Sequence, residues 1–177
     1  NTEAAAHAPV RAPDAGAPSR GSGPPLLIGA SVMLGSQEAL HDRLGWRAVI
    51  DAEVGRNPDD IAARLEAYRA SDALPSRVVV QMGENGPIRD QDMARVRAAL
   101  AGVDRVVLLN VHVPRSWQDD VNARLAAADA DWPEAVLADW DKAARRNLLY
   151  DDGIHPTPEG QKVYARVVQQ GLRAPGG

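Results

Sequence analysis

The sequence predicts a three-layer α/β/α domain built on a doubly wound sheet of five parallel strands. From Pro25 onward, short apolar runs alternate with segments of helical periodicity, and this alternation is typical of a parallel α/β sheet. The runs are continuously apolar, which indicates a sheet covered by helices on both faces. They lie at residues 26–30, 47–54, 77–82, 105–113 and 135–140. We expect the strand order 2-1-3-4-5, with ligands bound beyond the carboxyl ends of the strands.

Apolar residues at helical spacing predict the helices between these strands. Asn57 is a candidate cap with Pro58 in the first turn, Ser116 is a second candidate cap, and Thr157 with Pro158 begins the last helix. The periodic apolar positions are Ile61, Leu65 and Tyr68; Met93, Val96, Leu100 and Val103; Val121 and Leu125; and Val163, Val167 and Leu172.

Residues 1–24 are rich in Ala, Pro, Gly and Ser and hold almost nothing large and apolar, so we expect a flexible linker there. Residues 25–177 form the predicted domain. The chain begins with Asn, so we expect a piece of a larger protein with a partner domain upstream. No apolar stretch approaches the roughly 20 residues that cross a bilayer.

Composition excludes several function classes. A net charge of -4 and an isoelectric point near 5.5 argue against a nucleic-acid binder. The 177 residues include no cysteine, which excludes disulfides, thiolate catalysis and cysteine-bound zinc.

Small and polar residues gather where the predicted strands end. The first strand ends in Gly29-Ala30-Ser31, the second leads to Gly55 and Arg56, the third is followed by Gly83-Glu84-Asn85, and Asp152 and His155 follow the fifth. Carboxyl ends of parallel strands share one edge, so we expect these residues to lie together.

This set matches the requirements of acyl transfer. A hydroxyl nucleophile needs a base, and the base needs a third group to fix its tautomer. We expect Ser31 to be the nucleophile, His155 the base and Asp152 the group that orients it. The candidate oxyanion-hole donors are the backbone N–H groups of Ser31 and Gly55 and the side-chain amide of Asn85.

Each residue also has a purely structural interpretation. A Gly-x-Ser after a strand is usually a turn, Asn85-Gly86 is a common hairpin turn, and Asp-Gly before a helix often serves capping. His112, near the end of the fourth predicted strand, competes with His155 for the role of base, whereas His41 is expected to face solvent.

The same residues carry a resemblance to a known family. Ser31 in "IGASV", Gly55 in "DAEVGRN", Asn85 in "MGENG" and the pair in "DDGIHPTPEG" resemble the four blocks of SGNH (GDSL-like) hydrolases. Within that superfamily, residues 108–125 and 136–160 resemble the extracellular SGNH domain of bacterial acyltransferase-3 proteins, notably peptidoglycan O-acetyltransferases. The resemblance implies the SGNH hydrolase fold, with flavodoxin-like strand order. The family usually has Gly-Asp-Ser in its first block, and here Ala30 replaces the Asp, which is not a triad member.

The resemblance implies a two-step reaction. Ser31 takes an acetyl group from a donor presented at the membrane and passes it to the C6 hydroxyl of N-acetylmuramoyl residues in peptidoglycan. It implies no metal and no diffusible cofactor, an upstream membrane-embedded acyltransferase domain, and a position outside the bacterial cell membrane, at the cell wall. Arg115 and Trp117 are candidate glycan contacts; alternatively, Trp117 only packs at a helix start.

Two alternatives remain open at this point. The domain could be a carbohydrate or aryl acetylesterase that uses the same triad and passes the acyl group to water. It could also be a catalytically silent cell-wall binding module on the same fold.

Overall fold

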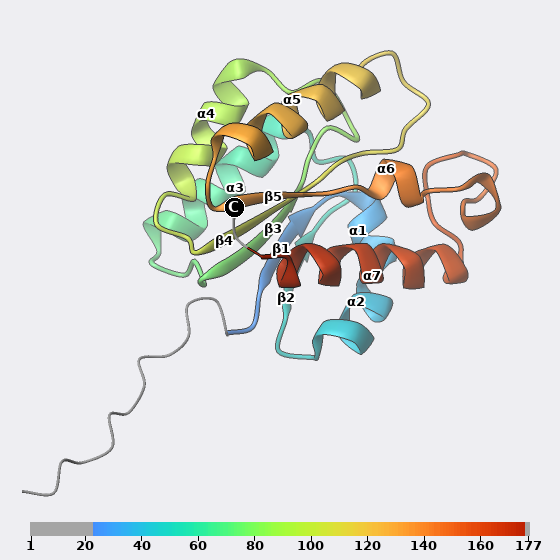
Figure 1. The fold of residues 1–177 in the computed structure, drawn as a ribbon, viewed down its shortest axis with the longest axis horizontal. Helices are drawn as coiled ribbons and strands as arrows, with labels where there is room; N and C mark the ends of the chain where they lie inside the picture. Colours follow the sequence, from blue (N-terminus) through green and yellow to red (C-terminus); the bar gives the residue numbers. More distant parts are fainter. Residues whose placement is uncertain (1–22, 176–177) are drawn as a thin grey trace, which may run out of the picture.

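The fold is a single five-stranded parallel sheet between two layers of helices, as predicted (Figure 1). The computed structural model describes residues 23–175, so nearly all of the expected linker lies outside the described residues. The sheet order is β2-β1-β3-β4-β5 and every neighbouring pair is parallel, which confirms the predicted order 2-1-3-4-5. The strands are β1 (Leu26–Gly29), β2 (Val49–Ala52), β3 (Arg77–Gln81), β4 (Arg105–Leu109) and β5 (Ala135–Ala138).

Two apolar clusters, one on each face of the sheet, form the core. On one face α3, α4 and α5 pack against the sheet, and on the other lie α1, α2 and α7, with Trp140 of α6 in the same cluster (Figure 1). Within the described residues no helix is long and apolar enough to cross a bilayer. The helices are α1 (Ser31–Gly35), α2 (Gln37–Leu44), α3 (Pro58–Ala70), α4 (Asp90–Ala99), α5 (Gln118–Asp131), α6 (Trp140–Ala143) and α7 (Pro158–Arg173), with a 3₁₀ turn at Arg146–Leu148.

Helix starts follow the predicted chemistry at two of three places. Asn57 caps α3 and exchanges two hydrogen bonds with Asp60, of 3.1 and 3.0 Å. Thr157 Oγ1 accepts from the Gly160 N–H at the start of α7. The prediction for Ser116 is wrong, because α5 begins at Gln118 and Trp117 occupies its cap position. There the Gln118 side chain turns back to accept from the Val113 N–H at 2.7 Å.

Several predicted elements are shorter than expected. The run at 47–54 gives β2 over Val49–Ala52, and the run at 135–140 gives β5 over Ala135–Ala138. The strand predicted to reach residue 113 ends at Leu109: the Asn110 N–H still donates to the Ala138 carbonyl at 3.2 Å, but the N–H and carbonyl of Val111 bond to the Asn122 side chain instead of a neighbouring strand. The helix predicted to include Val103 ends at Ala99, and Gly102, with φ of +84°, turns the chain toward β4. Val103, Val111 and Val113 are apolar because they are buried in loops, and the sequence therefore assigned them to a helix or a strand.

Candidate active site

Ser31 lies where the central strand β1 turns into α1. It is the first residue of that helix, and the buried Ala30 occupies the cap position. Pairing of Gly29 with Ala52 and of Ile28 with Val80 brings the ends of β2 and β3 beside it. The serine therefore lies at the carboxyl end of the sheet, beside β2 and β3, where ligand binding is predicted.

The segment that carries Asp152 and His155 is a closed loop in front of α7. Leu149 and Pro156 form an antiparallel bridge across its base, and the Tyr150 N–H donates to the His155 carbonyl at 2.8 Å. Gly153 has φ of +70°, a conformation that favours glycine. The loop therefore presents both side chains to β1 from a fixed backbone.

Gly160 ties this loop to the first turn of α7. The Thr157 N–H donates to the Leu148 carbonyl at 2.9 Å, and a Cβ added at Gly160 would overlap with that same carbonyl oxygen. Only a residue without a side chain allows this approach.

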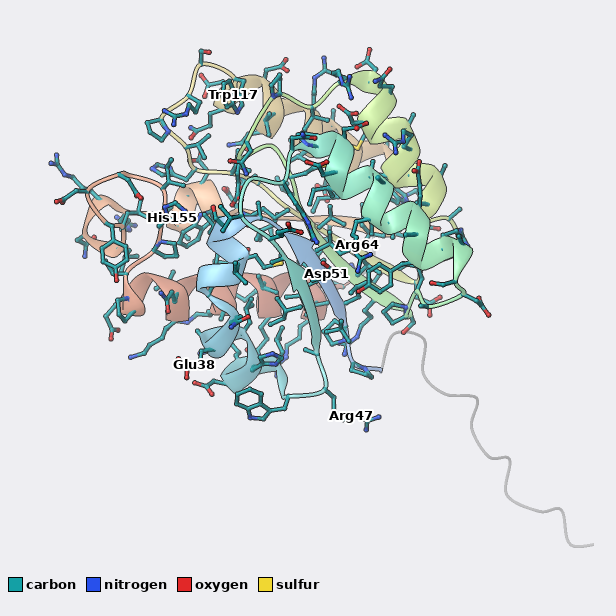
Figure 2. All side chains as sticks on the ribbon, turned by 180° about the vertical axis from the view of Figure 1, so that it is seen from behind. Glu38, Arg47, Asp51, Arg64, Trp117 and His155 are labelled. Atoms are coloured by element: carbon teal, nitrogen blue, oxygen red, sulfur yellow. The ribbon has the colours of Figure 1, made fainter. Side chains whose placement is uncertain are left out.

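The three predicted catalytic side chains are joined by hydrogen bonds. His155 Nε2 lies 2.9 Å from Ser31 Oγ, and His155 Nδ1 lies 2.6 Å from Asp152 Oδ2. Figure 2 shows His155 beside the helix that begins with Ser31. In the tautomer that donates Nδ1–H to the carboxylate, Nε2 is free to accept the serine proton.

Asp152 is held in its ionised form. Its Oδ1 accepts the backbone N–H groups of Ile154 (2.8 Å) and His155 (3.0 Å). The His155 imidazole, followed by these backbone donors, lowers the pKa of Asp152 to about 2. The carboxylate thus stays negative and able to orient the imidazole at any neutral pH.

The three candidate oxyanion-hole donors come from adjacent loops. Gly55 has φ of +83°, and Asn85 Nδ2 donates to the Arg56 carbonyl at 3.0 Å. An amide nitrogen carries two hydrogens, so one Asn85 N–H remains for a ligand. Within residues 23–175 neither the Ser31 nor the Gly55 N–H has an intramolecular acceptor.

Arg56 fixes the loop on which Asn85 depends. Its guanidinium donates to the Asp51 carbonyl at 2.8 Å and pairs with the Asp51 carboxylate at 2.7 Å, and both side chains are nearly buried. Burial by itself would raise the pKa of Asp51, but hydrogen bonds from Arg56, Tyr68 and Arg64 outweigh this effect, so the pKa is lowered. Arg56 thus connects the end of β2 to Asn85 through its own carbonyl.

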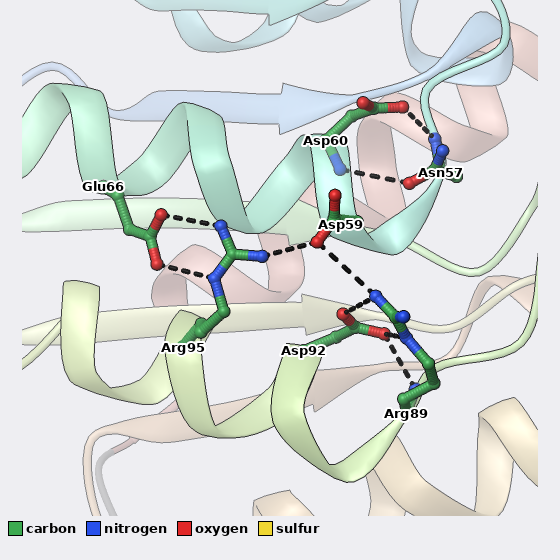
Figure 3. A network of polar contacts seen from close by, with 7 residues as sticks. All are labelled: Asn57, Asp59, Asp60, Glu66, Arg89, Asp92 and Arg95. Carbon is green, nitrogen blue, oxygen red and sulfur yellow. Dashed lines mark hydrogen bonds and ion pairs between the residues drawn. The ribbon is translucent and has the colours of Figure 1, made fainter.

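An ion-pair network joins the helices that follow these two loops (Figure 3). Asp59 of α3 accepts from Arg95 of α4 at 2.6 Å and pairs with Arg89 at 3.4 Å. Arg95 also binds Glu66 through both its Nε and Nη2 atoms at 2.7 Å. The network fixes α3 against α4, and with them the loops of Gly55 and Asn85.

His112 has a carboxylate partner of its own. Its Nδ1 is 2.7 Å from Asp141 Oδ1, and the Asp141 N–H donates to Asn110 Oδ1 at 2.8 Å. No hydrogen bond joins His112 to Ser31 among the described residues.

Of the two candidate glycan contacts, one is used by the fold. The Trp117 indole donates to the Gly83 carbonyl at 2.9 Å and packs against the core beneath α5. Arg115 is exposed in the same loop. The structural interpretation of Trp117 therefore accounts for its position, and its partly exposed ring leaves room for a second role.

Sequence reasoning did not identify the groups that support the site. The Asp51–Arg56 pair, the Asp141 partner of His112 and the burial of Glu84 were not expected. An arginine four residues after the end of β2 was the only sign of the Arg56 pair in the sequence. In the described part of the chain no group of three or more His, Asp or Glu side chains could hold a metal ion.

The comparisons with known proteins agree with this geometry. No family model matches the chain. The chain is 31% identical over 147 residues to the peptidoglycan O-acetyltransferase OatA of Listeria monocytogenes and 28% identical to the O-acetyltransferase OatA of Staphylococcus aureus. Each match covers 81% of this chain, which spans about a quarter of the length of these relatives (23% and 24%).

Solved structures show the same fold. The C-terminal catalytic domain of OatA from Streptococcus pneumoniae superposes with a TM-score of 0.77 at 22% identity, over 85% of this chain and 92% of that one. A GDSL-like lipase from Bacteroides thetaiotaomicron gives a TM-score of 0.66 at 16% identity, over 84% and 86%. These findings confirm the predicted SGNH hydrolase fold and the resemblance to peptidoglycan O-acetyltransferases.

Proposed function

We propose that this chain is the catalytic domain of a serine-dependent O-acetyltransferase that acetylates the C6 hydroxyl of N-acetylmuramoyl residues in peptidoglycan. The observation that carries the proposal is the hydrogen-bonded series from Ser31 through His155 to Asp152, in a chain whose curated relatives are named peptidoglycan O-acetyltransferases.

In the first half-reaction the enzyme is acetylated. Ser31 Oγ attacks the carbonyl carbon of an activated acetyl donor, and its proton moves to His155 Nε2. The bond from the acetyl carbon to the donor breaks, and the departing group takes the proton from His155. Negative charge on the carbonyl oxygen is stabilised by the N–H groups of Ser31, Gly55 and Asn85.

In the second half-reaction the acetyl group leaves the enzyme. His155 takes the proton of the glycan C6 hydroxyl, whose oxygen forms a bond to the acetyl carbon. The bond to Ser31 Oγ breaks, and the serine recovers its proton from His155. Asp152 stabilises the imidazolium in both halves, which requires the ionised carboxylate that its lowered pKa provides.

The acceptor site is proposed to extend along the exposed surface beside Asn85. A hollow of about 420 Å³ lies there, lined in part by Asn85, Asn57 and Arg89, and these amide and guanidinium groups are suitable for sugar hydroxyls. Arg115 and Trp117 are proposed as further glycan contacts. In the full-length protein we place this domain at the cell wall, following a membrane-embedded acyltransferase domain.

The test is acetyl transfer to a defined acceptor. Purified protein is incubated with a small activated acetyl ester and muroglycan oligomers, and mass spectrometry measures an added acetyl group of about 42 Da on muramoyl residues. Ser31→Ala is the matched control. Hydrolysis of the ester without any acetylated glycan would contradict transfer, and an unchanged product yield with Ser31→Ala would contradict the nucleophile.

The acetylesterase remains the second candidate. Its support is that solved structures of the same fold include an acetyl esterase and a carbohydrate esterase of family 3, at TM-scores of 0.55 and 0.57. The half-exposed triad also allows water to reach an acetyl-serine. The same incubation separates the candidates, because an esterase releases acetate at one rate whether or not glycan is present.

A further inference from the structure

Glu84 is a buried carboxylic acid beside the proposed active site. It lies between Gly83 and Asn85 after β3, and only 7% of its surface is exposed. Among residues 23–175 neither of its carboxyl oxygens has a hydrogen-bond partner. Buried, unpaired carboxyl groups are rare in native proteins, because an ionised one costs far more than a neutral one.

The surroundings of Glu84 point to a neutral carboxyl group. The backbone N–H of Val32, in the first turn of α1, faces it and favours its ionised form, without reaching hydrogen-bonding geometry. Burial outweighs this and raises the pKa of Glu84 to about 8. No arginine, lysine or histidine of the described chain acts on it.

Tyr164 of α7 is the ionisable group that senses the charge of Glu84, and it belongs to the same apolar cluster as Val32. Its hydroxyl donates to Gln81 Oε1 at 2.6 Å, and Gln81 in turn donates to the Asn110 carbonyl at 3.1 Å. Burial, and secondly the charge of Glu84, raise the pKa of Tyr164 well above its usual value. The phenol therefore stays neutral over the range in which Glu84 titrates.

Glu84 also lies near a residue that lacks the expected side chain. Ala30, where the resemblance to SGNH hydrolases leads us to expect an Asp, is buried directly before the nucleophile and offers no polar group. Glu84 approaches the same turn from β3, through Val32. A carboxyl group from another segment thus lies near the backbone of Val32, the residue after Ser31.

We propose that Glu84 is a positioning residue for Ser31 and Asn85, and that its carboxyl group must be neutral for the transfer reaction. A neutral carboxyl group fills the buried space beside the turn by packing alone, and it does not oppose the oxyanion that forms between the donors of Ser31 and Asn85. An ionised carboxylate there would place a second negative charge beside that oxyanion, in a site of low dielectric constant. The inference rests on the proposed function, because it concerns the same acyl-serine chemistry.

The first test is the pH dependence of turnover. With a small acetyl ester, kcat of the wild type is expected to fall at least about tenfold between pH 7 and pH 10, with its midpoint near pH 8. In Glu84→Gln, which keeps the shape and stays neutral, the same ratio is expected to fall below about twofold. Glu38→Gln, an exposed glutamate on α2 (Figure 2), is the matched control and should keep the wild-type profile.

A purely structural role would shift all rates equally and leave the two profiles parallel, which would overturn the proposal. Absence of any alkaline decline in the wild type would overturn it as well. Spontaneous ester hydrolysis is subtracted with Ser31→Ala.

The second test needs no activity. A group whose folded pKa is raised contributes stability that is full below its unfolded pKa, near 4.5, and is lost as the pH rises through its folded pKa, about 8. Two proteins that both carry Ser31→Ala are compared, one with Glu84 and one with Glu84→Gln. As the pH rises from 4.5 to 8, the melting temperature of the Glu84→Gln protein is expected to increase relative to that of the Glu84 protein. A constant difference over that range would overturn the neutral carboxyl. If the wild type shows no turnover but this gain is observed, the proposed function fails while the buried neutral acid stands.

Discussion

Two histidine–aspartate pairs lie beyond the carboxyl ends of the strands, and they differ in what each imidazole can reach. His155 is 2.6 Å from Asp152, and His112 is 2.7 Å from Asp141. The side chains of His112 and Asp141 are 32% and 35% exposed, less than those of His155 and Asp152, which are 41% and 46% exposed. Only His155 has a hydroxyl at its other nitrogen, at 2.9 Å. Carboxylate contact and burial therefore do not distinguish a catalytic histidine, whereas the position of the nucleophile does.

The backbone explains this difference. His112 lies three residues after β4, in a loop held by Asn122, which bonds both the N–H and the carbonyl of Val111. His155 lies in the closed loop before α7, which directs it across the sheet to β1. The four predictions below contrast the two pairs.

The largest contrast is expected between the two histidines. Ser31→Ala and His155→Gln should each lower kcat for a small acetyl ester by roughly 10³-fold or more, because they remove the nucleophile or its base. His112→Gln should change kcat by less than about threefold, below 1 kcal/mol of barrier. Steady-state kinetics with folded protein measures all three. A loss with His112→Gln as large as with His155→Gln would reverse the assignment of the base.

The two aspartates should differ in the same direction. Asp152→Asn is expected to lower kcat roughly 10²- to 10³-fold, because an amide no longer selects the productive tautomer. The effect should be smaller than that of the serine, since water reaches this half-exposed carboxylate. Asp141→Asn is the matched control, and its kcat should stay close to that of the wild type. Equal losses in both variants would show that the pairs act together.

A third change acts on the loop rather than on the pair. Gly160→Ala should destabilise the protein by about 1–3 kcal/mol, because its methyl group overlaps with the Leu148 carbonyl. The strain falls on the segment that presents His155, so kcat should fall while the environment of His112 is unchanged. Urea unfolding measures the first effect and the two histidine ring signals in NMR the second. A shift confined to His112 would contradict this assignment.

The smallest expected effect is on acid stability. The folded pKa of Asp152 is lowered to about 2 from 3.8, so its contribution is present above pH 3.8 and lost as the pH falls through 2. The melting temperature of the wild type should exceed that of Asp152→Asn at pH 7, and the gap should close between pH 4 and 2. Asp151→Asn, the exposed neighbour, controls for removal of a surface charge. A gap independent of pH would mean that the carboxylate has no net stabilising contacts.

Much of the fold could be predicted from the sequence because it depends on local patterns. Continuous apolar runs predicted the five strands, and Asn57-Pro58 and Thr157-Pro158 predicted two helix starts that the structure has. Ser31, Asp152 and His155 could be proposed because each follows the end of an element. The ends of β4 and α4 could not be predicted, because Val103, Val111 and Val113 are as buried in loops as strand residues are in the sheet.

The supporting groups were harder to predict because they depend on contacts between distant segments. Asp51 and Arg56 are close in sequence, but their burial depends on how α3 packs. Glu84 is a charged residue in a polar stretch, and nothing local indicates that Val32 and Tyr164 enclose it. The partner of His112 lies 29 residues away.

The separation of Ser31 and His155 by 124 positions along the chain also has a kinetic consequence. Ser31 begins α1, directly after the first strand, whereas the loop of His155 is held by the last helix. Contacts of such long sequence separation form slowly and late in folding. A chain that has formed the central sheet but not yet docked α7 would carry an unactivated serine. Recovery of ester hydrolysis during refolding should therefore lag behind the recovery of secondary structure.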